Sequence, residues 1–360
     1  MDSFKWTQEE AELEKWDSFL DENPRGHFSQ LSTWLKSYKA YGFDFKVLLG
    51  YEKDQIIGGL GVVIAKASIF RFYIAPYGPI VSKGFEGSMG VLLEEFYRDA
   101  KKRGATYCQA NIPSVAKENV LLNDYIVNDY DDSILPKNYH IGSQFKFVSS
   151  NVRLGVVDLH YGEENSYEST ALSFKSNTRR DVNKSQRIQN ELVFAKTKAE
   201  IFEAYTVIQN NADTIGYAVR SWEDIKETLI AMVSNNRCLI PTCFNDGDLK
   251  GALVVFIGGR RLSYIMGATK REKKDLMVGH FLQNEMIKYS IDKQFSFYDI
   301  SAGGSKGVMK FKEGFGANFV DLVGPRYWIC NPLKFRVYAK TLPYLKRNKK
   351  LASKILKFFK

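Results

Sequence analysis

A strand-like run, a glycine-rich turn and a lysine-rich segment follow one another near the C-terminal end of the sequence. The run 295–300 contains Tyr298 and Asp299, and the turn 301–304 reads Ser-Ala-Gly-Gly. Lysines follow at positions 306, 310 and 312. Glycines let backbone N–H groups approach phosphate or carboxylate oxygens, and lysines add positive charge. This order predicts a pocket that faces an anion. A helix start with solvated lysines gives the same pattern and stays open as the alternative.

A second basic cluster lies in the middle of the sequence, at the expected start of a helix. It consists of Arg179, Arg180 and Lys184. The planar fork of an arginine side chain matches the geometry of phosphate oxygens, which favours contact with a diphosphate. A solvated basic helix face is the alternative for these three residues.

Two halves of the chain carry the same order of predicted elements, and these elements must position both clusters. Each half reads as a hairpin, an aromatic strand, an amphipathic helix and a further strand. The paired segments are 53–64 and 246–257, 70–74 and 261–265, and 106–110 and 296–300, with helical spacing at Val91, Leu92, Phe96 and Ala100 in the first half and at Phe281, Leu282, Met286, Ile287 and Tyr289 in the second. Gly58 and Gly251 are 193 positions apart, and Tyr107 and Tyr298 are 191 positions apart. We infer an internal duplication.

Hairpin, strand, helix and strand in this order form the core of the GNAT acyltransferase fold, a mixed sheet with helices on its faces. We therefore predict a mixed α/β protein with two tandem GNAT-like domains, at 1–148 and 149–330, and a tail at 331–360. In GNAT enzymes a glycine-rich turn at the central helix binds the pyrophosphate of CoA. The second half offers Gly279 there without an arginine in the right place, and the first half offers glycines without a basic lead residue. Neither half predicts a CoA site.

The segment around the glycine-rich turn resembles the C-terminal signature of the Fem family, the non-ribosomal peptidyltransferases that use aminoacyl-tRNA to build peptidoglycan cross-bridges. The matching residues are Tyr298-Asp299, the turn itself, Phe311-Lys312 and Phe315-Gly316. The segment 30–42 is similar to the family's N-terminal pattern, in which Gln is followed by Trp four residues later and then by a nearby Lys. The run 178–184 is similar to the Arg-rich helix start of the family's second half. These patches follow the family's order from residue 30 to 316, so the resemblance covers most of the chain.

The resemblance implies that the reacting groups meet near Lys312. Its expected role is electrostatic stabilisation of the oxyanion that forms when an amine attacks an aminoacyl ester. Phe311 is expected to pack and fix this loop, with Lys310 and Gly316 as substrate-binding neighbours. Tyr298 and Asp299 end a strand, and strand alternation allows only one of them to face the cleft. With no obvious general base, catalysis is expected mainly from positioning.

The acceptor implied by the resemblance is a muropeptide or lipid-linked cell-wall precursor. Its diphosphate is expected to contact Arg179, Arg180 and Lys184 in the second half and Lys36 or Lys39 in the first. The family's lysine usually stands four residues beyond the Trp, where this chain has a tyrosine, so the choice between Lys36 and Lys39 stays open. Gln30 and Trp34 complete the expected first-half substrate site.

Three further features depart from or extend the family pattern. After its first-half strand the family often reads Asp-Pro, whereas this chain has Asn111-Ile112-Pro113, so no acid/base role is assigned there. The segment 185–235 is too short and lacks the heptads of the family's coiled-coil arm, so we expect an arm-less chain. The segment of about 325–345 is expected to pack back on the first domain.

The excess of positive charge lies in the tail. Ten Lys or Arg and no Asp or Glu occur between 334 and 360, which leaves 41 basic against 41 acidic residues elsewhere. This argues against a generally basic nucleic-acid-binding surface. Apolar residues fall at helical spacing from Leu345 onward, and Pro343 is expected to separate this helix from the preceding segment. A basic amphipathic helix suits an anionic membrane, with contact to a tRNA backbone or packing on the protein body as alternatives.

Metal and disulfide chemistry are not indicated. The four cysteines are scattered, and none of the four histidines has a partner at metal or triad spacing. No apolar run approaches the ~20 residues that span a bilayer. We expect a cytoplasmic protein with reduced thiols and without a cofactor, in peripheral contact with the inner face of the plasma membrane.

Three functions fit these features. The first is a peptidyltransferase that adds an amino acid from aminoacyl-tRNA to a muropeptide precursor. The second is a GNAT-like N-acyltransferase that modifies an amino sugar or polysaccharide precursor of the cell surface, against which the missing CoA loop weighs. The third is a non-catalytic, membrane-bound binding protein, against which the Phe311-Lys312 signature weighs.

Overall fold

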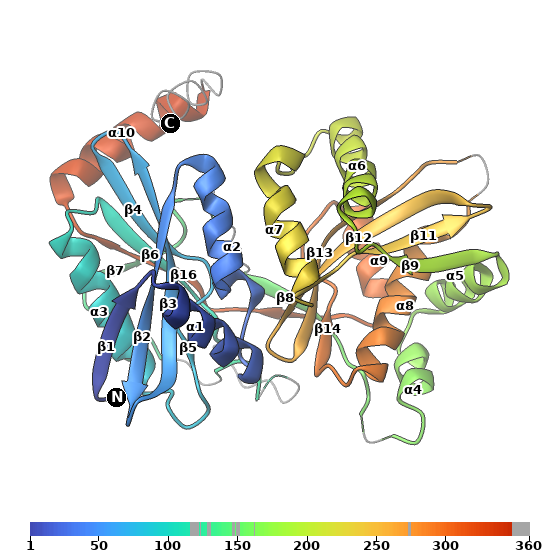
Figure 1. Cartoon of the computed structure of the whole chain (residues 1–360), viewed down its shortest axis with the longest axis horizontal. Helices are drawn as coiled ribbons and strands as arrows, with labels where there is room; N and C mark the ends of the chain where they lie inside the picture. The colour runs from blue at the N-terminus through green and yellow to red at the C-terminus, as the bar shows by residue number, and fades with distance from the viewer. Residues whose placement is uncertain are drawn as a thin grey trace. The chain divides into compact units, whose positions relative to one another are not determined.

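The computed structural model of the chain divides into two compact units (Figure 1). The first contains Met1–Val152 and Asp321–Lys360, and the second contains Arg153–Val320. The structure describes residues 1–115, 122, 124–127, 131–145, 148, 152–161, 163–272 and 275–347.

The first unit is built on a mixed sheet. Its strands, in spatial order, are β1 (Ser3–Thr7), β2 (Asp44–Glu52), β3 (Gln55–Ala67), β4 (Phe70–Ala75), β6 (Tyr107–Ile112), β16 (Gly324–Ile329) and β7 (Tyr139–Ile141), with β5 (Ile80–Val81) paired to β3. The β2–β3 hairpin turns at Lys53 and Asp54, both at positive φ, as a two-residue hairpin turn requires. β4 and β6 run parallel, and β16 returns to pair with β6.

Helices cover both faces of this sheet. They are α1 (Glu10–Glu22), η1 (Phe28–Gln30), α2 (Ser32–Lys36), η2 (Ser37–Tyr41), α3 (Ser88–Lys102), η4 (Asp132–Ile134) and α10 (Pro332–Arg347). The neighbouring glycines 58 and 59 of β3 lie against α3 and α1 respectively, and successive strand positions face opposite sides, so these two helices lie on opposite faces. Leu92, Phe96 and Ala100 of α3 are buried as expected, but Val91 is 48% exposed because it lies at the edge of that apolar stripe.

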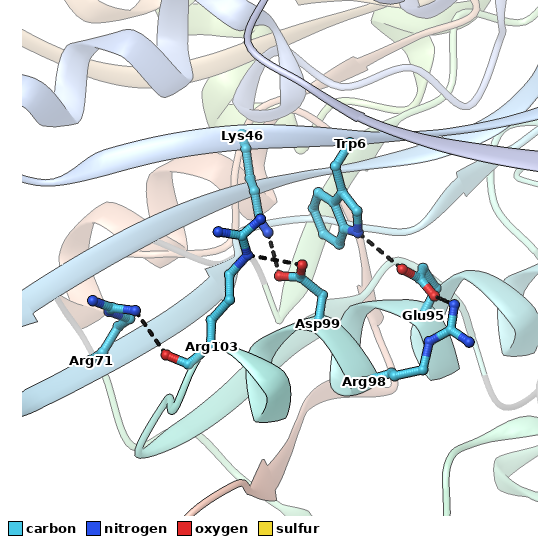
Figure 2. Close-up of polar contacts among 7 residues, drawn as sticks. All are labelled: Trp6, Lys46, Arg71, Glu95, Arg98, Asp99 and Arg103. Atoms are coloured by element: carbon cyan, nitrogen blue, oxygen red, sulfur yellow. Dashed lines mark hydrogen bonds and ion pairs between the residues drawn. The ribbon is translucent and has the colours of Figure 1, made fainter.

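A charged cluster joins α3 to the strands of the first unit (Figure 2). The Lys46 Nζ on β2 bonds to Asp99 on α3, and the Arg103 Nε donates to the same carboxylate at 3.0 Å. The Trp6 ring lies 3.8 Å from the Lys46 Nζ, and the Trp6 indole donates to Glu95 at 3.1 Å. Burial lowers the pKa of Lys46, whereas the Asp99 carboxylate opposes that shift.

The second unit repeats the order of the first. Its strands, in spatial order, are β15 (Asn318–Asp321), β8 (Arg153–Val157), β14 (Phe297–Asp299), β13 (Arg261–Thr269), β12 (Asp248–Gly258), β11 (Pro241–Asn245) and β9 (Asn190–Phe194), with β10 (Cys238–Leu239) paired to β12. The β11–β12 hairpin turns at Asp246 and Gly247, and β13 runs parallel to β14 as β4 does to β6. The expected tandem of two GNAT-like units is confirmed by this shared topology.

Helix α8 fills the place that α3 has in the first unit. The helices of the second unit are α4 (Ser166–Leu172), α5 (Ser176–Arg187), α6 (Lys198–Ile215), α7 (Trp222–Ser234), α8 (Val278–Asp292) and α9 (Lys306–Gly314). Phe281, Leu282, Met286 and Ile287 of α8 join the buried core under the sheet. The segment 185–235 forms the end of α5, β9 and the helices α6 and α7, of 18 and 13 residues, and α6 contacts β12 and β13.

The last described helix, α10, differs from the prediction that Pro343 ends a segment. Helix α10 runs from Pro332 to Arg347 and therefore passes through Pro343, which was expected to separate two segments. Proline removes one helical hydrogen bond but does not forbid the helix when other contacts hold it. Phe335 and Tyr338 supply such contacts, with ring centroids 6.0 and 5.7 Å from that of Tyr107 on β6. The expected amphipathic segment beyond residue 347 lies outside the described residues.

Candidate functional site

Lys312 lies in the interior of the second unit, on the last turn of α9. Its side chain is 3% exposed, and its Nζ donates to the Ser301 Oγ at 2.6 Å and to the Gly303 carbonyl at 2.9 Å. The Nζ also lies 5.3 Å from the centre of the Tyr264 ring. Burial lowers the pKa of Lys312 to about 8, and the Asp299 carboxylate opposes that shift. This setting excludes the alternative of a solvated helix lysine.

The local sequence explains why α9 presents Lys312 to the turn before it. Ser305 caps the helix by accepting a hydrogen bond from the Val308 N–H. Phe311, the preceding residue, points about 100° away around the helix and packs against the rings of His280 and Phe315, at 5.0 and 5.3 Å. The predicted packing role of Phe311 fits these contacts, whereas Lys310 is exposed.

Tyr298 and Asp299 are both buried. Because successive side chains of a strand point to opposite faces, the two residues have different hydrogen-bond partners. The Tyr298 hydroxyl donates to the Gln283 Oε1 of α8 at 2.7 Å. The Asp299 Oδ1 accepts from the N–H groups of Gly155 and Ser301, each at 2.9 Å. Burial raises the pKa of Asp299, although these two N–H groups act in the opposite direction. Asp299 is therefore the member of the pair that fixes the turn around Lys312.

Ser301 is a site residue that the sequence argument missed. It is half-buried and has φ of 60°, a left-handed conformation that is uncommon for a residue other than glycine. The feature of the sequence that could have identified Ser301 is its position: it is the first hydroxyl residue after a strand, and it opens the glycine-rich turn. Its contact with a lysine eleven residues away depends on how α9 packs.

Gly316, two residues after the end of α9, stands at a position that has no room for a side chain. Its φ is 70°, and a Cβ there would lie 2.4 Å from the Ser173 Oγ. Gly314 is equally close to a neighbour, with a Cβ position 2.2 Å from the Thr178 Oγ1. These glycines let the end of α9 approach Ser173, which follows α4, and Thr178 of α5, the helix that carries the basic cluster.

The basic cluster lies on α5, with Arg179 and Arg180 near its start and Lys184 in its last turn. The Arg179 guanidinium donates to the Leu172 and Phe174 carbonyls at 2.7 and 2.8 Å and lines a cavity of about 340 Å³. Arg180 is exposed and pairs with Asp181 at 3.1 Å. Lys184 is exposed one turn later. The structure thus presents two of these cations to solvent and places the third at a cavity wall.

The four residues predicted to bind substrate in the first unit differ from one another in burial and in their contacts. Gln30 is fully buried, and its amide bonds to the N–H and carbonyl of Gly61, so it holds the start of α2 against β3 instead of facing a ligand. Trp34 is 7% exposed and packs edge-on against a phenylalanine ring. Lys36 pairs with the Glu10 carboxylate at 2.8 Å, and Lys39 is exposed.

A further cavity of about 380 Å³ lies at the start of α8, where GNAT enzymes bind a pyrophosphate. Lys270 and Arg271 line it, but so do acidic side chains. The Asp275 carboxylate accepts a hydrogen bond from the Met277 N–H at 2.9 Å, so this N–H group at the start of α8 is already paired with an acidic side chain. Among the described residues, no three His, Cys, Asp or Glu side chains gather in a way that could hold a metal ion.

Comparison with solved structures shows the fold. A structure titled crystal structure of FemX superposes with a TM-score of 0.74 at 12% identity, over 93% of this chain and 99% of that one. The structure of L-PGS from Bacillus licheniformis superposes with a TM-score of 0.54 at 12% identity, over 92% and 96% of the two chains.

Comparison at the sequence level identifies the family. Lipid II:glycine glycyltransferase of Staphylococcus epidermidis is 26% identical over 117 residues, which are 30% of this chain and 28% of that relative. The chain thus spans less than a third of the curated relative it matches. The FemAB family matches residues 11–223 and 245–341, which is most of the sequence. The chain therefore belongs to the FemAB family.

Proposed function

We propose that this protein is an acyltransferase that adds an amino acid from aminoacyl-tRNA to a peptidoglycan precursor. Membership of the FemAB family and the partial match to a lipid II:glycine glycyltransferase support the reaction class. The observation that carries the proposal is the buried Lys312, held by Ser301 and Gly303 at the centre of the second unit. A buried cation held against a glycine-rich turn suits a reaction in which negative charge develops on one oxygen.

The proposed reaction needs little acid or base strength. The acceptor amine forms a bond to the carbonyl carbon of the aminoacyl ester, and the carbonyl oxygen becomes an oxyanion near the Lys312 charge. The ester C–O bond then breaks, and the leaving ribose oxygen takes the proton that the amine loses. Because the ester is already activated, charge stabilisation and positioning supply the main acceleration.

The proposed acceptor is a muropeptide carried on a diphosphate, as in a lipid-linked precursor. Arg179 at its cavity wall and the exposed Arg180 and Lys184 are the second-unit cations proposed to contact the diphosphate. Lys36 and Lys39 are proposed for the same contact in the first unit. Of these two, Lys39 is more exposed, whereas Lys36 must leave the Glu10 carboxylate to bind a phosphate.

The test of this function is a comparison of donors. The full chain is given a lipid-linked muropeptide in detergent micelles, with labelled mixed aminoacyl-tRNA in one reaction and labelled acetyl-CoA in another. We expect the amino-acid label to transfer and the acetyl label to stay in solution. Transfer of acetyl instead would establish the GNAT-like N-acyltransferase alternative, and a UDP-linked muropeptide as second acceptor shows whether the lipid is needed.

We also propose that α10 contacts an anionic membrane. Among the described residues no helix is long and apolar enough to span a bilayer. Leu333, Arg336, Val337 and Lys340 share one exposed face of α10, with Leu333 at 73% and Val337 at 48% exposure. Exposed apolar side chains flanked by cations are typical of an interfacial helix.

Vesicle co-sedimentation tests the membrane contact. The double variant Leu333→Ser, Val337→Ser is expected to bind anionic vesicles at least ~10-fold more weakly than the wild type, because the apolar part of the contact is lost. The matched control is Ile215→Ser, which removes a 56% exposed apolar side chain from α6. Equal binding of the wild type and the double variant would refute the role of α10. Comparing the full chain with a chain that ends at Asn348 measures how much the remaining tail adds to vesicle binding.

A further inference from the structure

We propose that the Ser301 hydroxyl is the group that touches the oxyanion, and that Lys312 acts through it as a positioning residue. This inference rests on the acyl transfer proposed above and changes which atom meets the substrate.

Ser301 and Lys312 differ in how far they are exposed to solvent. Lys312 is 3% exposed, whereas Ser301 is half-buried and opens the turn between β14 and α9. The Lys312 Nζ contacts the Ser301 Oγ, with the Gly303 carbonyl as its other acceptor and the centre of the Tyr264 ring 5.3 Å away. A substrate carbonyl that approaches this turn therefore meets the serine hydroxyl before it meets the ammonium.

The direction of the hydrogen bonds follows from the chemistry of the partners. A carbonyl oxygen can only accept, so the Lys312 ammonium donates to Gly303. An ammonium has no acceptor, so it also donates to the Ser301 Oγ at 2.6 Å. The serine O–H is then directed to a different acceptor. A hydroxyl that accepts from a cation is also a stronger donor, because hydrogen bonds in a chain polarise one another.

The backbone holds Ser301 in place against its own preference. A φ of 60° is unfavourable for a residue other than glycine and persists only where its surroundings impose it. The Asp299 carboxylate imposes it here by accepting the Ser301 N–H at 2.9 Å while also holding Gly155 of the neighbouring strand. An uncommon conformation fixed by a buried carboxylate is typical of a preorganised site, and the residue so fixed is the one that carries the hydroxyl.

The proposed step balances without a covalent enzyme intermediate. As the amine nitrogen bonds to the ester carbon, the carbonyl oxygen gains negative charge and accepts a hydrogen bond from the Ser301 O–H. The serine proton stays on serine. When the ester C–O bond breaks, the carbonyl re-forms, and the proton from the amine goes to the leaving oxygen. Lys312 keeps its proton throughout and maintains the polarity of the serine hydroxyl.

Variants at position 301 distinguish the effect of the hydroxyl from the effect of the backbone conformation. Ser301→Gly removes the hydroxyl and suits the positive φ, so it is expected to keep the fold while losing roughly 100-fold in kcat. Ser301→Ala should lose a similar factor. Ser301→Asn should recover part of the rate, because asparagine tolerates the left-handed conformation and its amide can donate.

Combination with Lys312→Ala tests whether the two residues act as one unit. If Lys312 acts through the serine, the double variant Ser301→Gly, Lys312→Ala is expected to be no slower than the worse single variant. Independent factors that multiply in the double variant would overturn the inference, and so would full turnover by Ser301→Gly. An acyl group found on Ser301 by intact-mass analysis would replace it with covalent catalysis. A wild type that transfers no amino acid from aminoacyl-tRNA refutes the proposed function and this role together, whereas an active wild type with a fully active Ser301→Gly refutes this role alone.

Discussion

Replacing Lys312 by alanine is expected to lower kcat for aminoacyl transfer by roughly 100-fold, the effect of losing one oxyanion-stabilising group. The side chain is buried against Ser301 and Gly303, so its charge acts where water cannot screen it. Lys312→Met keeps most of the volume without the charge and should lose a similar factor. Lys293→Ala, which removes an exposed lysine from the end of α8, is the control and should keep the wild-type rate.

The pH profile distinguishes a charge effect from a structural one. Burial lowers the pKa of Lys312 to about 8, so the wild-type rate should fall as the pH rises through that value, and Lys312→Met should lack this step. The stability changes in the opposite direction. Between about 8 and the ordinary value of 10.5 the unfolded chain holds a proton that the folded chain has released, so the contribution of this group to the free energy of unfolding rises with pH. A rate that stays constant up to pH 10 would contradict the proposed role of the ammonium.

Local patterns explain why the repeat could be predicted from the sequence. Asp54, Asp246 and Gly247 are residue types that tolerate the positive φ of these turns, and each turn stands between two β-rich runs, so both hairpins could be predicted without tertiary information. The strand that ends at Asp299 was predicted for the same reason, whereas the helix that carries Lys312 was only one of two interpretations of its segment. Elements specified within ten to fifteen residues are those that sequence patterns predict best.

The surroundings of individual site residues could not be predicted in this way. Gln30 matches the family pattern, yet its amide is bonded to Gly61, 31 residues away on a strand, and a spacing argument does not see that partner. The structure places Lys312 on a helix, which the sequence left open as an alternative, and whether solvent or the glycine-rich turn covers its side chain depends on tertiary packing. The hydrogen bond to Ser301 and the fixing of that serine by Asp299 are likewise contacts between segments.

Helix α10 shows how packing overrides a local signal. Pro343 reads as a boundary in the sequence, but the helix continues to Arg347. Its earlier turns are anchored by Tyr338, whose ring lies 4.9 Å from Phe72 and 5.8 Å from Phe70 of β4. The aromatic residues of that strand were visible in the sequence, but their pairing with a helix more than 260 residues later was not.

Asp99→Ala in the first unit is expected to destabilise the protein by about 3–5 kcal/mol, the usual cost of leaving one partner of a buried ion pair uncompensated. Lys46 is 7% exposed and bonds to this carboxylate, and Arg103 donates to it from the other side (Figure 2). Without Asp99, two cations would face each other beside the Trp6 ring. The free energy of unfolding can be followed by tryptophan fluorescence in urea in a Trp222→Phe background, because the four remaining tryptophans lie in the first unit.

Two further variants show whether the cost arises from the unpaired charge or from lost packing. Arg98→Ala removes a 71% exposed partner of Glu95 on the same helix and should cost less than about 1 kcal/mol. Adding Lys46→Met to Asp99→Ala removes the buried charge while keeping an apolar side chain under the Trp6 ring, and should recover a large part of the lost stability. A double variant as unstable as Asp99→Ala alone would show that the carboxylate, and not the uncompensated Lys46, holds α3 against β2. Recovery would instead show that the pair sets how helix and strand meet, while the apolar core around Leu92 and Phe96 supplies the stability.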